Sequence, residues 1–159
     1  MEFIVDKENA RIQVIRNFSA PLQTVWDAWT KSEILDQWWA PKPWKARTKS
    51  MDFRVGGRWV YAMVGPDGSE QYCLADYLEI SPLKSYVGRD AFCDENENIS
   101  TDFPGSTWLV EFSFDGKMTT VSITIQHNSL EDLEKIVSMG FKEGFTMGLQ
   151  NLEDWLSGK

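Results

Sequence analysis

The chain has 159 residues, of which 42% are apolar, 13% aromatic and 25% charged, and its net charge is −8. This length suits one domain with its own core, so we expect a single domain over residues 1–159. The excess of acidic side chains, with no basic cluster, argues against binding to nucleic acid or to an anionic membrane.

Targeting, membrane and metal signals are lacking. Residues 1–7 have neither the basic start nor the apolar run of a signal peptide, and no stretch approaches the roughly 20 apolar residues of a membrane span. Cys73 and Cys93 are too few for a disulfide framework, and their spacing matches no metal motif. We therefore expect a cytoplasmic protein with two reduced cysteines, no metal and no cofactor.

The first part of the chain predicts a strand followed by two short helices. Residues 11–18 have strand composition, and Pro21 suits the first turn of a helix. Apolar residues then follow at helical spacing: Leu22, Val25, Trp26 and Trp29. Thr30 and Glu33 form a T-x-x-E capping box, which predicts a second helix that ends before Pro41.

The middle of the chain predicts an antiparallel sheet. Alternating apolar residues mark strands over 50–55, 59–63, 84–93, 108–114 and 120–125, with turn signals between them. A further strand places four side chains on its expected inner face: Tyr72, Leu74, Leu78 and Ile80. Because no helix separates these strands, consecutive strands are expected to pair in antiparallel fashion.

A long helix is predicted at the end of the chain. Ser129 is its expected N-cap, with Asp132 three residues later, and apolar residues keep helical spacing to Leu156. Some 27 residues would span roughly 40 Å at about 1.5 Å each. Only a curved sheet can wrap around such a helix. The predicted fold is therefore α+β, a curved antiparallel sheet around a long C-terminal helix, with two short helices after the first strand.

An ordered series of motifs supports this prediction. They are FSAP at 18–21, VWDAWT at 25–30, WWAP at 38–41, RVGGRW at 54–59 and YLEISP at 77–82. Over about residues 11–157 the chain resembles the family named for homologues of the Hsp-type chaperone ATPase activator, in the START-like (SRPBCC) superfamily. The resemblance implies a helix-grip fold and a link to the stress response. It departs at Gly144-Phe145, where Trp more often follows the glycine in the family.

An apolar pocket is expected between the sheet and the last helix, because the chain is rich in aromatic side chains. The expected ligand-binding walls are Trp59, Tyr61, Met63, Tyr72, Leu74, Trp108, Val110, Phe112, Phe141, Gly144, Phe145 and Gly148. Gly140, Gly144 and Gly148 recur every fourth residue, and each costs about 1 kcal/mol relative to alanine within a helix. Either close backbone packing or space for a ligand would explain this stripe.

Three polar residues stand at strand positions where the alternation predicts an inward-facing, apolar side chain. His127 is expected to point inward at the mouth of the sheet, either as a proton donor or acceptor or, as we favour, as a polar strand end. Asp76 and Asp90 are either anchors inside the pocket or, as we favour, residues that a bulge turns outward. No complete catalytic set is evident, so we assign no catalytic residue.

Three functions fit these features, and the superfamily resemblance does not choose among them. The first, which we favour, is non-catalytic binding of an apolar or amphipathic small molecule. The second is a polyketide cyclase or dehydratase reaction carried by His127, Asp76 and Asp90. The third is docking on a chaperone through an exposed patch. The Trp38-Trp39 pair, expected to be exposed, is a candidate for that patch, although we favour the interpretation that it seals the pocket mouth.

Overall fold

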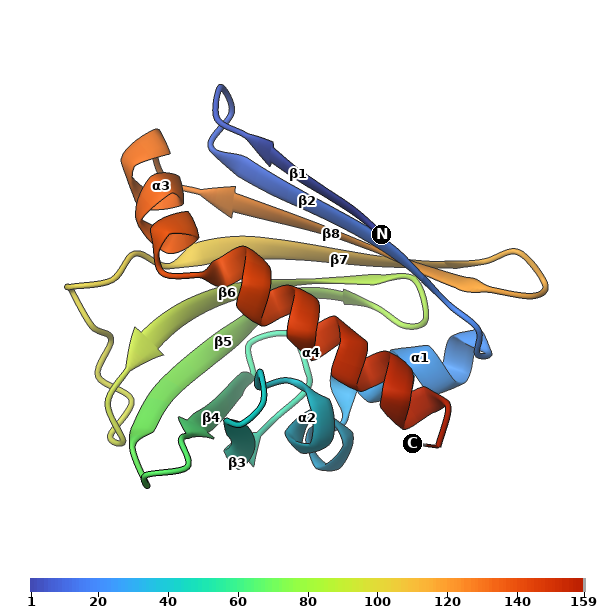
Figure 1. Cartoon of the computed structure of the whole chain (residues 1–159), viewed down its shortest axis with the longest axis horizontal. Coiled ribbons are helices and arrows are strands. Elements are labelled where there is room, and N and C mark those ends of the chain that lie inside the picture. Colours follow the sequence, from blue (N-terminus) through green and yellow to red (C-terminus); the bar gives the residue numbers. More distant parts are fainter. Residues whose placement is uncertain (159) are drawn as a thin grey trace.

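A curved sheet wrapped around a C-terminal helix forms the frame of the computed structural model, which describes residues 1–158 (Figure 1). The last residue of the predicted domain, Lys159, lies outside the described residues. The neighbouring strands are antiparallel, in the order β1 (Glu2–Asp6), β2 (Arg11–Phe18), β8 (Thr119–His127), β7 (Ser106–Phe114), β6 (Ser85–Cys93), β5 (Glu70–Ser81), β4 (Arg58–Val64) and β3 (Lys45–Met51). The helices are α1 (Leu22–Thr30), α2 (Ser32–Trp38), α3 (Leu130–Ser138) and α4 (Phe141–Leu156). The predicted fold class is confirmed.

Regular alternation builds the centre of the sheet. Val121, Ile123 and Ile125 on β8 are at most 1% exposed, whereas the threonines and serines between them face outward. The Asp115 carboxylate accepts hydrogen bonds from the backbone N–H groups of Lys117 and Met118. These bonds close the β7–β8 hairpin at the turn that the sequence indicates.

Two strands at the edges of the sheet differ from the prediction. β1 was not predicted, although it pairs with β2 along its whole length. β3 ends at Met51, so residues 52–57 form a loop rather than the expected strand. Phe53 explains the difference, because its ring packs edge-on against Tyr77 at 4.7 Å and anchors this loop to the core.

The capping box predicted for the second helix does not form. Thr30 is buried in the last turn of α1, where its hydroxyl donates a hydrogen bond to the Trp26 carbonyl. Thr30 is the last residue of α1, and the N-cap position of α2 is Lys31, so α2 starts without a side-chain cap. Trp38 was expected to be exposed but is 1% exposed, and its indole N–H donates to the Ala28 carbonyl.

The predicted terminal helix is two helices. Ser129 caps α3 as expected, accepting a hydrogen bond from the Asp132 backbone N–H. The helix breaks at Gly140, whose φ of 87° lies in the left-handed region that glycine adopts readily. α4 then crosses the concave face of the sheet toward α1 and α2 (Figure 1). The helical spacing continues across Gly140, which is why the break is not visible in the apolar pattern.

Up to Tyr77, the inner face of β5 is the opposite of the prediction, whereas Ile80, beyond a bulge, packs against the core as predicted. Cys73, Ala75 and Tyr77 face the interior, whereas Leu74 packs with Val60 and Cys93 in a separate apolar cluster. A bulge between Tyr77 and Glu79 then reverses the parity of the strand. Alternating apolar residues occur on both faces of β5, so the pattern alone did not identify the inner face.

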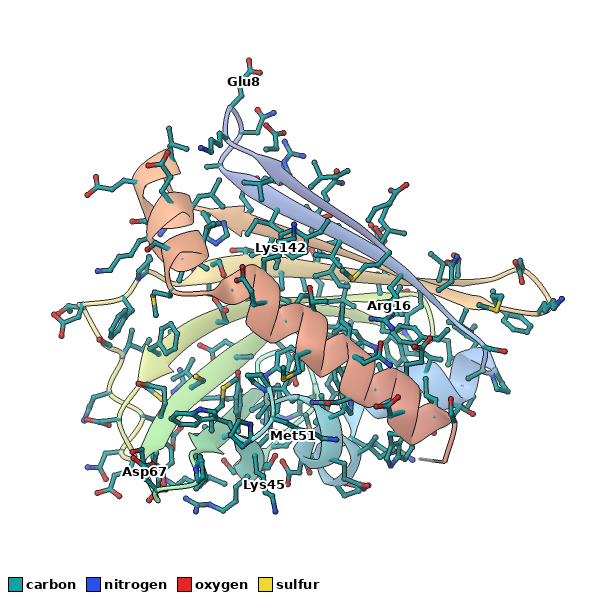
Figure 2. All side chains as sticks on the ribbon, in the orientation of Figure 1. Glu8, Arg16, Lys45, Met51, Asp67 and Lys142 are labelled. Carbon is teal, nitrogen blue, oxygen red and sulfur yellow. The ribbon has the colours of Figure 1, made fainter. Side chains whose placement is uncertain are left out.

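Charged side chains project from the loops and outer faces, as Glu8, Lys45 and Asp67 illustrate (Figure 2). Within residues 1–158, no helix is both long and apolar enough to cross a membrane. Over the same residues, no group of three His, Cys, Asp or Glu side chains lies close enough to hold a metal ion.

Candidate functional site

A cavity of about 290 Å³ lies between the concave face of the sheet and the C-terminal helices. Its floor comes from β4 to β8, and its cover comes from α3, α4 and the end of α2. This volume is at the lower end of the range of ordinary ligand pockets, which suits a compact ligand.

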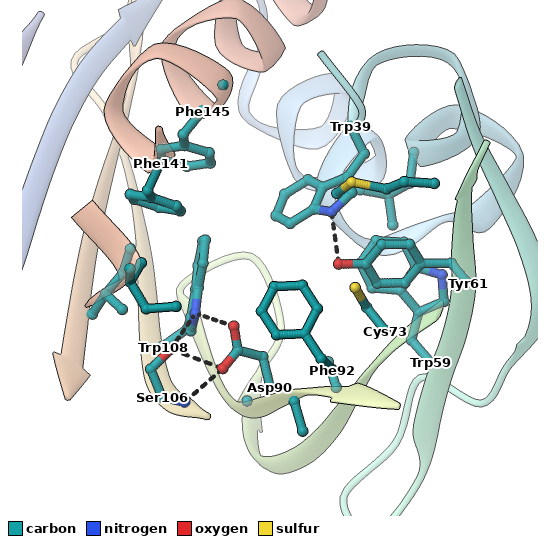
Figure 3. Close-up of a pocket in the computed structure, with 18 of the residues that line it drawn as sticks. Trp39, Trp59, Tyr61, Cys73, Asp90, Phe92, Ser106, Trp108, Phe141 and Phe145 are labelled. Carbon is teal, nitrogen blue, oxygen red and sulfur yellow. Dashed lines mark hydrogen bonds between the residues drawn. The ribbon is translucent and has the colours of Figure 1, made fainter. Parts of the chain in front are cut away.

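Phe, Tyr and Trp side chains make up 10 of the 26 residues that line the cavity (Figure 3). On one side, Trp59 and Tyr61 of β4 stack with ring centroids 4.0 Å apart. On the other side, Phe141 and Phe145 of α4 stack at 5.3 Å. Trp39, which follows α2, donates a hydrogen bond from its indole N–H to the Tyr61 hydroxyl at 3.0 Å. This bond fixes the end of α2 against the sheet, so the cavity wall is held in place.

The predicted wall residues divide into two groups. Seven line the cavity: Trp59, Tyr61, Met63, Trp108, Phe141, Gly144 and Phe145. Five lie outside its lining: Tyr72, Leu74, Val110, Phe112 and Gly148. Tyr72 and Leu74 lie on the outer face of β5, because the prediction assigned the wrong face of this part of the strand to the interior. Phe112 packs under α1 at 5.0 Å from the Trp26 ring, and Val110 is buried in the core. The role of these residues in binding a ligand stays a prediction.

The three glycines of the stripe serve three different purposes. Gly140 forms the left-handed break between the helices. A Cβ atom at Gly144 would meet only the Pro41 ring, at an ordinary 3.7 Å, and Gly144 lines the cavity. A Cβ atom at Gly148 would lie 3.2 Å from the Trp39 carbonyl oxygen and 3.6 Å from that of Trp38. Close packing therefore explains Gly148, whereas open space explains Gly144.

Asp90 is the carboxylate of the cavity. The favoured prediction, that a bulge turns it outward, was wrong: β6 has no register shift there, and Asp90 pairs with Ser106 of β7 on the inner face. Its oxygen Oδ1 accepts hydrogen bonds from the Ser106 N–H at 2.7 Å and the Ser106 hydroxyl at 2.8 Å. Oδ2 accepts one from the Trp108 indole N–H at 3.0 Å. Asp90 keeps some accessible surface because it faces the cavity, yet it lies deep in the protein, and this burial raises its pKa.

His127 lies beside Ser106 on the next strand, because the two residues pair in the β7–β8 register. Its side chain lines the cavity as parity predicted, and the residue is 3% exposed. Burial lowers the pKa of the imidazole, so the neutral form is favoured. Asp90, Ser106 and His127 therefore form a polar row across β6, β7 and β8.

Asp76 lies outside the cavity, as favoured, but no bulge turns it outward: it pairs in register with the strands on both sides and shares the outer face of β5 with Leu74. Its carboxylate forms a two-pronged ion pair with the Arg58 guanidinium, with N–O distances of 2.5 and 3.0 Å. Glu97 approaches the same guanidinium at 3.5 Å. These groups form a salt-bridge network away from the cavity.

Several cavity residues were missed by the sequence analysis. Cys73 and Tyr77 were assigned to the wrong face of β5, and Ser106 carries no signal in the sequence beyond its place at a strand start. Burial raises the pKa of the Cys73 thiol to about 12 and that of the Tyr61 hydroxyl well above its ordinary value. Both groups are therefore neutral at physiological pH.

The chemistry available to the polar row is limited. The Ser106 hydroxyl is bonded to a carboxylate rather than to the imidazole, which is not the order of an activated serine nucleophile. Among the hydrogen bonds of residues 1–158, none joins the His127 side chain to Asp90 or Ser106, and its buried Nδ1 atom has no partner there.

Comparison with known proteins gives a family and a set of related folds. The family described as "Activator of Hsp90 ATPase homolog 1-like protein" matches residues 19–157. The structure is similar to that of a Mycobacterium smegmatis protein, with 26% identity, a TM-score of 0.90, and coverage of 98% of this chain and 96% of that one. It is also similar to a protein from Arthrobacter aurescens, with 25% identity, a TM-score of 0.94, and coverage of 99% and 92%. A third similar protein, from Staphylococcus epidermidis, has 27% identity, a TM-score of 0.85, and coverage of 96% and 93%. The comparison with curated proteins found no match.

Proposed function

The chain belongs to the family of activator of Hsp90 ATPase homolog 1-like proteins, and we propose that it binds a compact, largely apolar small molecule in the cavity without catalysing a reaction. The observation that carries this proposal is the aromatic-lined space of about 290 Å³ between the sheet and α4. The aromatic rings around this space do not fill it. Gly144 widens it by lacking a side chain.

The driving force for binding would be burial of apolar surface. Each square ångström of apolar surface removed from water contributes about 25 cal/mol before the losses of association are subtracted. Trp39 after α2, Trp108 of β7 and Phe145 of α4 pack against one another, with ring centroids 5.4 to 6.1 Å apart, so a ligand in the cavity could contact all three. The Trp39–Tyr61 hydrogen bond holds part of this wall in place before any ligand arrives.

A second candidate function has one observation in its favour. Asp90 and His127 do line the cavity together, as a cyclase-like enzyme with acid and base groups requires. We rank it second because Asp90 only accepts hydrogen bonds, from Ser106 and Trp108, which suits a carboxylate rather than a proton donor, and because His127 has no orienting hydrogen bond to Asp90 or Ser106. Docking on a chaperone, the third hypothesis, rests on the family description alone.

A cytoplasmic location is part of the same proposal. The two buried, free cysteines support it, because thiols persist in a reducing compartment.

Direct binding measurements test the proposal. Native mass spectrometry of the freshly purified protein would reveal a retained small molecule as a discrete mass increment. Calorimetric titration with naphthalen-1-ylmethanol, a neutral compact aromatic, should then give saturable binding near one molecule per chain. Gly144→Leu provides the blocked-site control, since its side chain would enter the cavity. Absence of saturable binding to the folded protein, or equal binding to this variant, would overturn the proposal.

A further inference from the structure

Asp90 is the one formally charged side chain among the described residues that line the cavity; the lining includes no Lys or Arg. The other titratable groups facing this space are neutral at physiological pH. Burial lowers the pKa of the His127 imidazole and raises the pKa values of the Cys73 thiol and of the three tyrosine hydroxyls in the lining, Tyr61, Tyr77 and Tyr86. The electrostatic character of the cavity therefore depends on one carboxyl group.

The surroundings of Asp90 are built for a carboxylate. Its three hydrogen bonds come from the Ser106 N–H, the Ser106 hydroxyl and the Trp108 indole N–H. A backbone N–H and an indole N–H can only donate, so at these two positions a protonated carboxyl would find no acceptor. Burial outweighs these donors and raises the pKa of Asp90 overall, while the donors at both oxygens favour the ionised form.

This carboxylate has no ion-pair partner among residues 1–158. Arg89, the next residue on β6, acts on Asp90 only weakly, because its guanidinium bonds the Thr107 hydroxyl and the Asn128 amide oxygen. Asp76 on the neighbouring strand, by contrast, holds Arg58 in a two-pronged pair. A buried carboxylate is costly unless a cation accompanies it, and at Asp90 the protein supplies hydrogen bonds without the cation.

We propose that the ligand supplies this cation: the cavity takes a compact aromatic or aliphatic amine, with its ammonium group against Asp90 and its apolar part against the aromatic rings that line the cavity. This inference rests on the proposed function, of which it specifies the ligand class. An ammonium group donates to carboxylate oxygens through charge-assisted hydrogen bonds, which are stronger than neutral ones. Asp90 thereby acts as the residue that determines specificity.

The rings around Asp90 favour the same ligand. Figure 3 shows the carboxyl group between Trp108 and Phe92, below the open middle of the cavity. A ring face within about 6 Å attracts a cation. Trp108 turns its N–H edge to the carboxylate, so this attraction would come from the other rings of the cavity. An anionic ligand, such as a fatty acid, would meet the Asp90 charge in a space without a basic side chain. The site therefore selects against anions as well as for cations.

Three probes with one ring system test the proposal by calorimetry: naphthalen-1-ylmethanamine, naphthalen-1-ylmethanol and naphthalene-1-carboxylate. On the wild-type protein we expect the amine to bind at least about tenfold more tightly than the alcohol, and the carboxylate to bind most weakly. Asp90→Asn should bring the amine and the alcohol within about threefold of each other. Asp76→Asn is the matched control, because it removes the same charge outside the cavity and should keep the preference for the amine.

The outcomes separate this inference from the function on which it rests. If none of the probes binds, the proposed function fails. If the alcohol binds as tightly as the amine on the wild-type protein, the cavity binds ligands but Asp90 does not select a cation. A preference for the amine that survives Asp90→Asn, or disappears in Asp76→Asn, would overturn the proposal by assigning the effect to overall charge. If Asp90→Asn does not fold, the ranking of the three probes on the wild-type protein still decides.

Discussion

Replacing Gly144 by leucine should stabilise the protein and abolish binding at the same time. The first atom of the new side chain meets only the Pro41 ring, at 3.7 Å, and the rest extends toward the cavity that Gly144 lines. The same substitution at Gly148 meets two backbone carbonyl oxygens, at 3.2 and 3.6 Å. The two glycines lie one turn apart on α4, so they form a matched pair.

The expected magnitudes have opposite signs. At Gly144, leucine gains about 0.8 kcal/mol of helix propensity and up to about 1.5–3 kcal/mol from burial, less about 0.5–1 kcal/mol of side-chain entropy. Because burial in the cavity is incomplete, we expect a net gain of about 1–2 kcal/mol, or roughly 2–8 °C in Tm. At Gly148, displacing α4 from the Trp38 and Trp39 carbonyls costs about 1–3 kcal/mol or more, which outweighs the gain in propensity.

Thermal unfolding and calorimetric titration with naphthalen-1-ylmethanol would be run on both variants. For Gly144→Leu we expect a higher Tm and no detectable binding. For Gly148→Leu we expect a lower Tm, with residual binding by the folded fraction. A fall in Tm for Gly144→Leu comparable to that for Gly148→Leu would refute the reasoning, because it would mean that close packing explains both positions.

Three further predictions concern titratable groups. Ellman's reagent at about pH 8 should leave Cys73 unmodified in the native protein, because burial raises its thiol pKa to about 12, and should modify it after unfolding. Burial raises the pKa of Asp90 on folding, so between the unfolded and folded pKa values the native state binds one more proton than the unfolded state. The stability of the wild-type protein relative to Asp90→Asn should therefore fall as the pH rises through that window. Urea titrations at a series of pH values would detect the fall. His127→Gln should leave the affinity for naphthalen-1-ylmethanol within about threefold. Because burial lowers the imidazole pKa, the variant should also lack the part of the stability loss that sets in as the pH falls below about 6.5. A pH profile of stability that is the same in the variant and the wild-type protein would contradict the assignment to Asp90 or to His127, respectively.

The fold was predictable because most of its elements have one apolar face. The strands of 108–114 and 120–125 and the helical spacing after Ser129 each indicate a single inner face, and all were found. The errors lie where another interaction overrides that signal. A left-handed glycine breaks a continuous helical pattern at Gly140, and the Phe53 ring draws a loop into the core where alternation indicated a strand.

The candidate site was less predictable, because it depends on which face of a strand looks inward. β5 carries apolar residues on both faces, so the assignment of Leu74 rather than Cys73 to the cavity could not be settled from alternation. For Asp90 the pattern did indicate the inner face, but the cost of burying a carboxylate favoured the opposite interpretation. The three donors on Ser106 and Trp108 offset part of that cost, and they lie about 16 residues away in sequence.

The cavity is difficult to explain as a defect of packing. A dry void of about 290 Å³ would cost up to about 7 kcal/mol at roughly 24 cal/mol per Å³, which is comparable with the whole stability of an ordinary domain. Contact with solvent reduces that cost, but one leucine at Gly144 would reduce it further, with a gain in helix propensity. Asn151 meanwhile donates hydrogen bonds to the Trp38 and Ala40 carbonyls, which hold α4 against the end of α2 beside the open space. A chain that keeps a glycine facing an open volume, and keeps the surrounding walls bonded, retains space that stability alone does not require, and the proposed ligand binding would explain why.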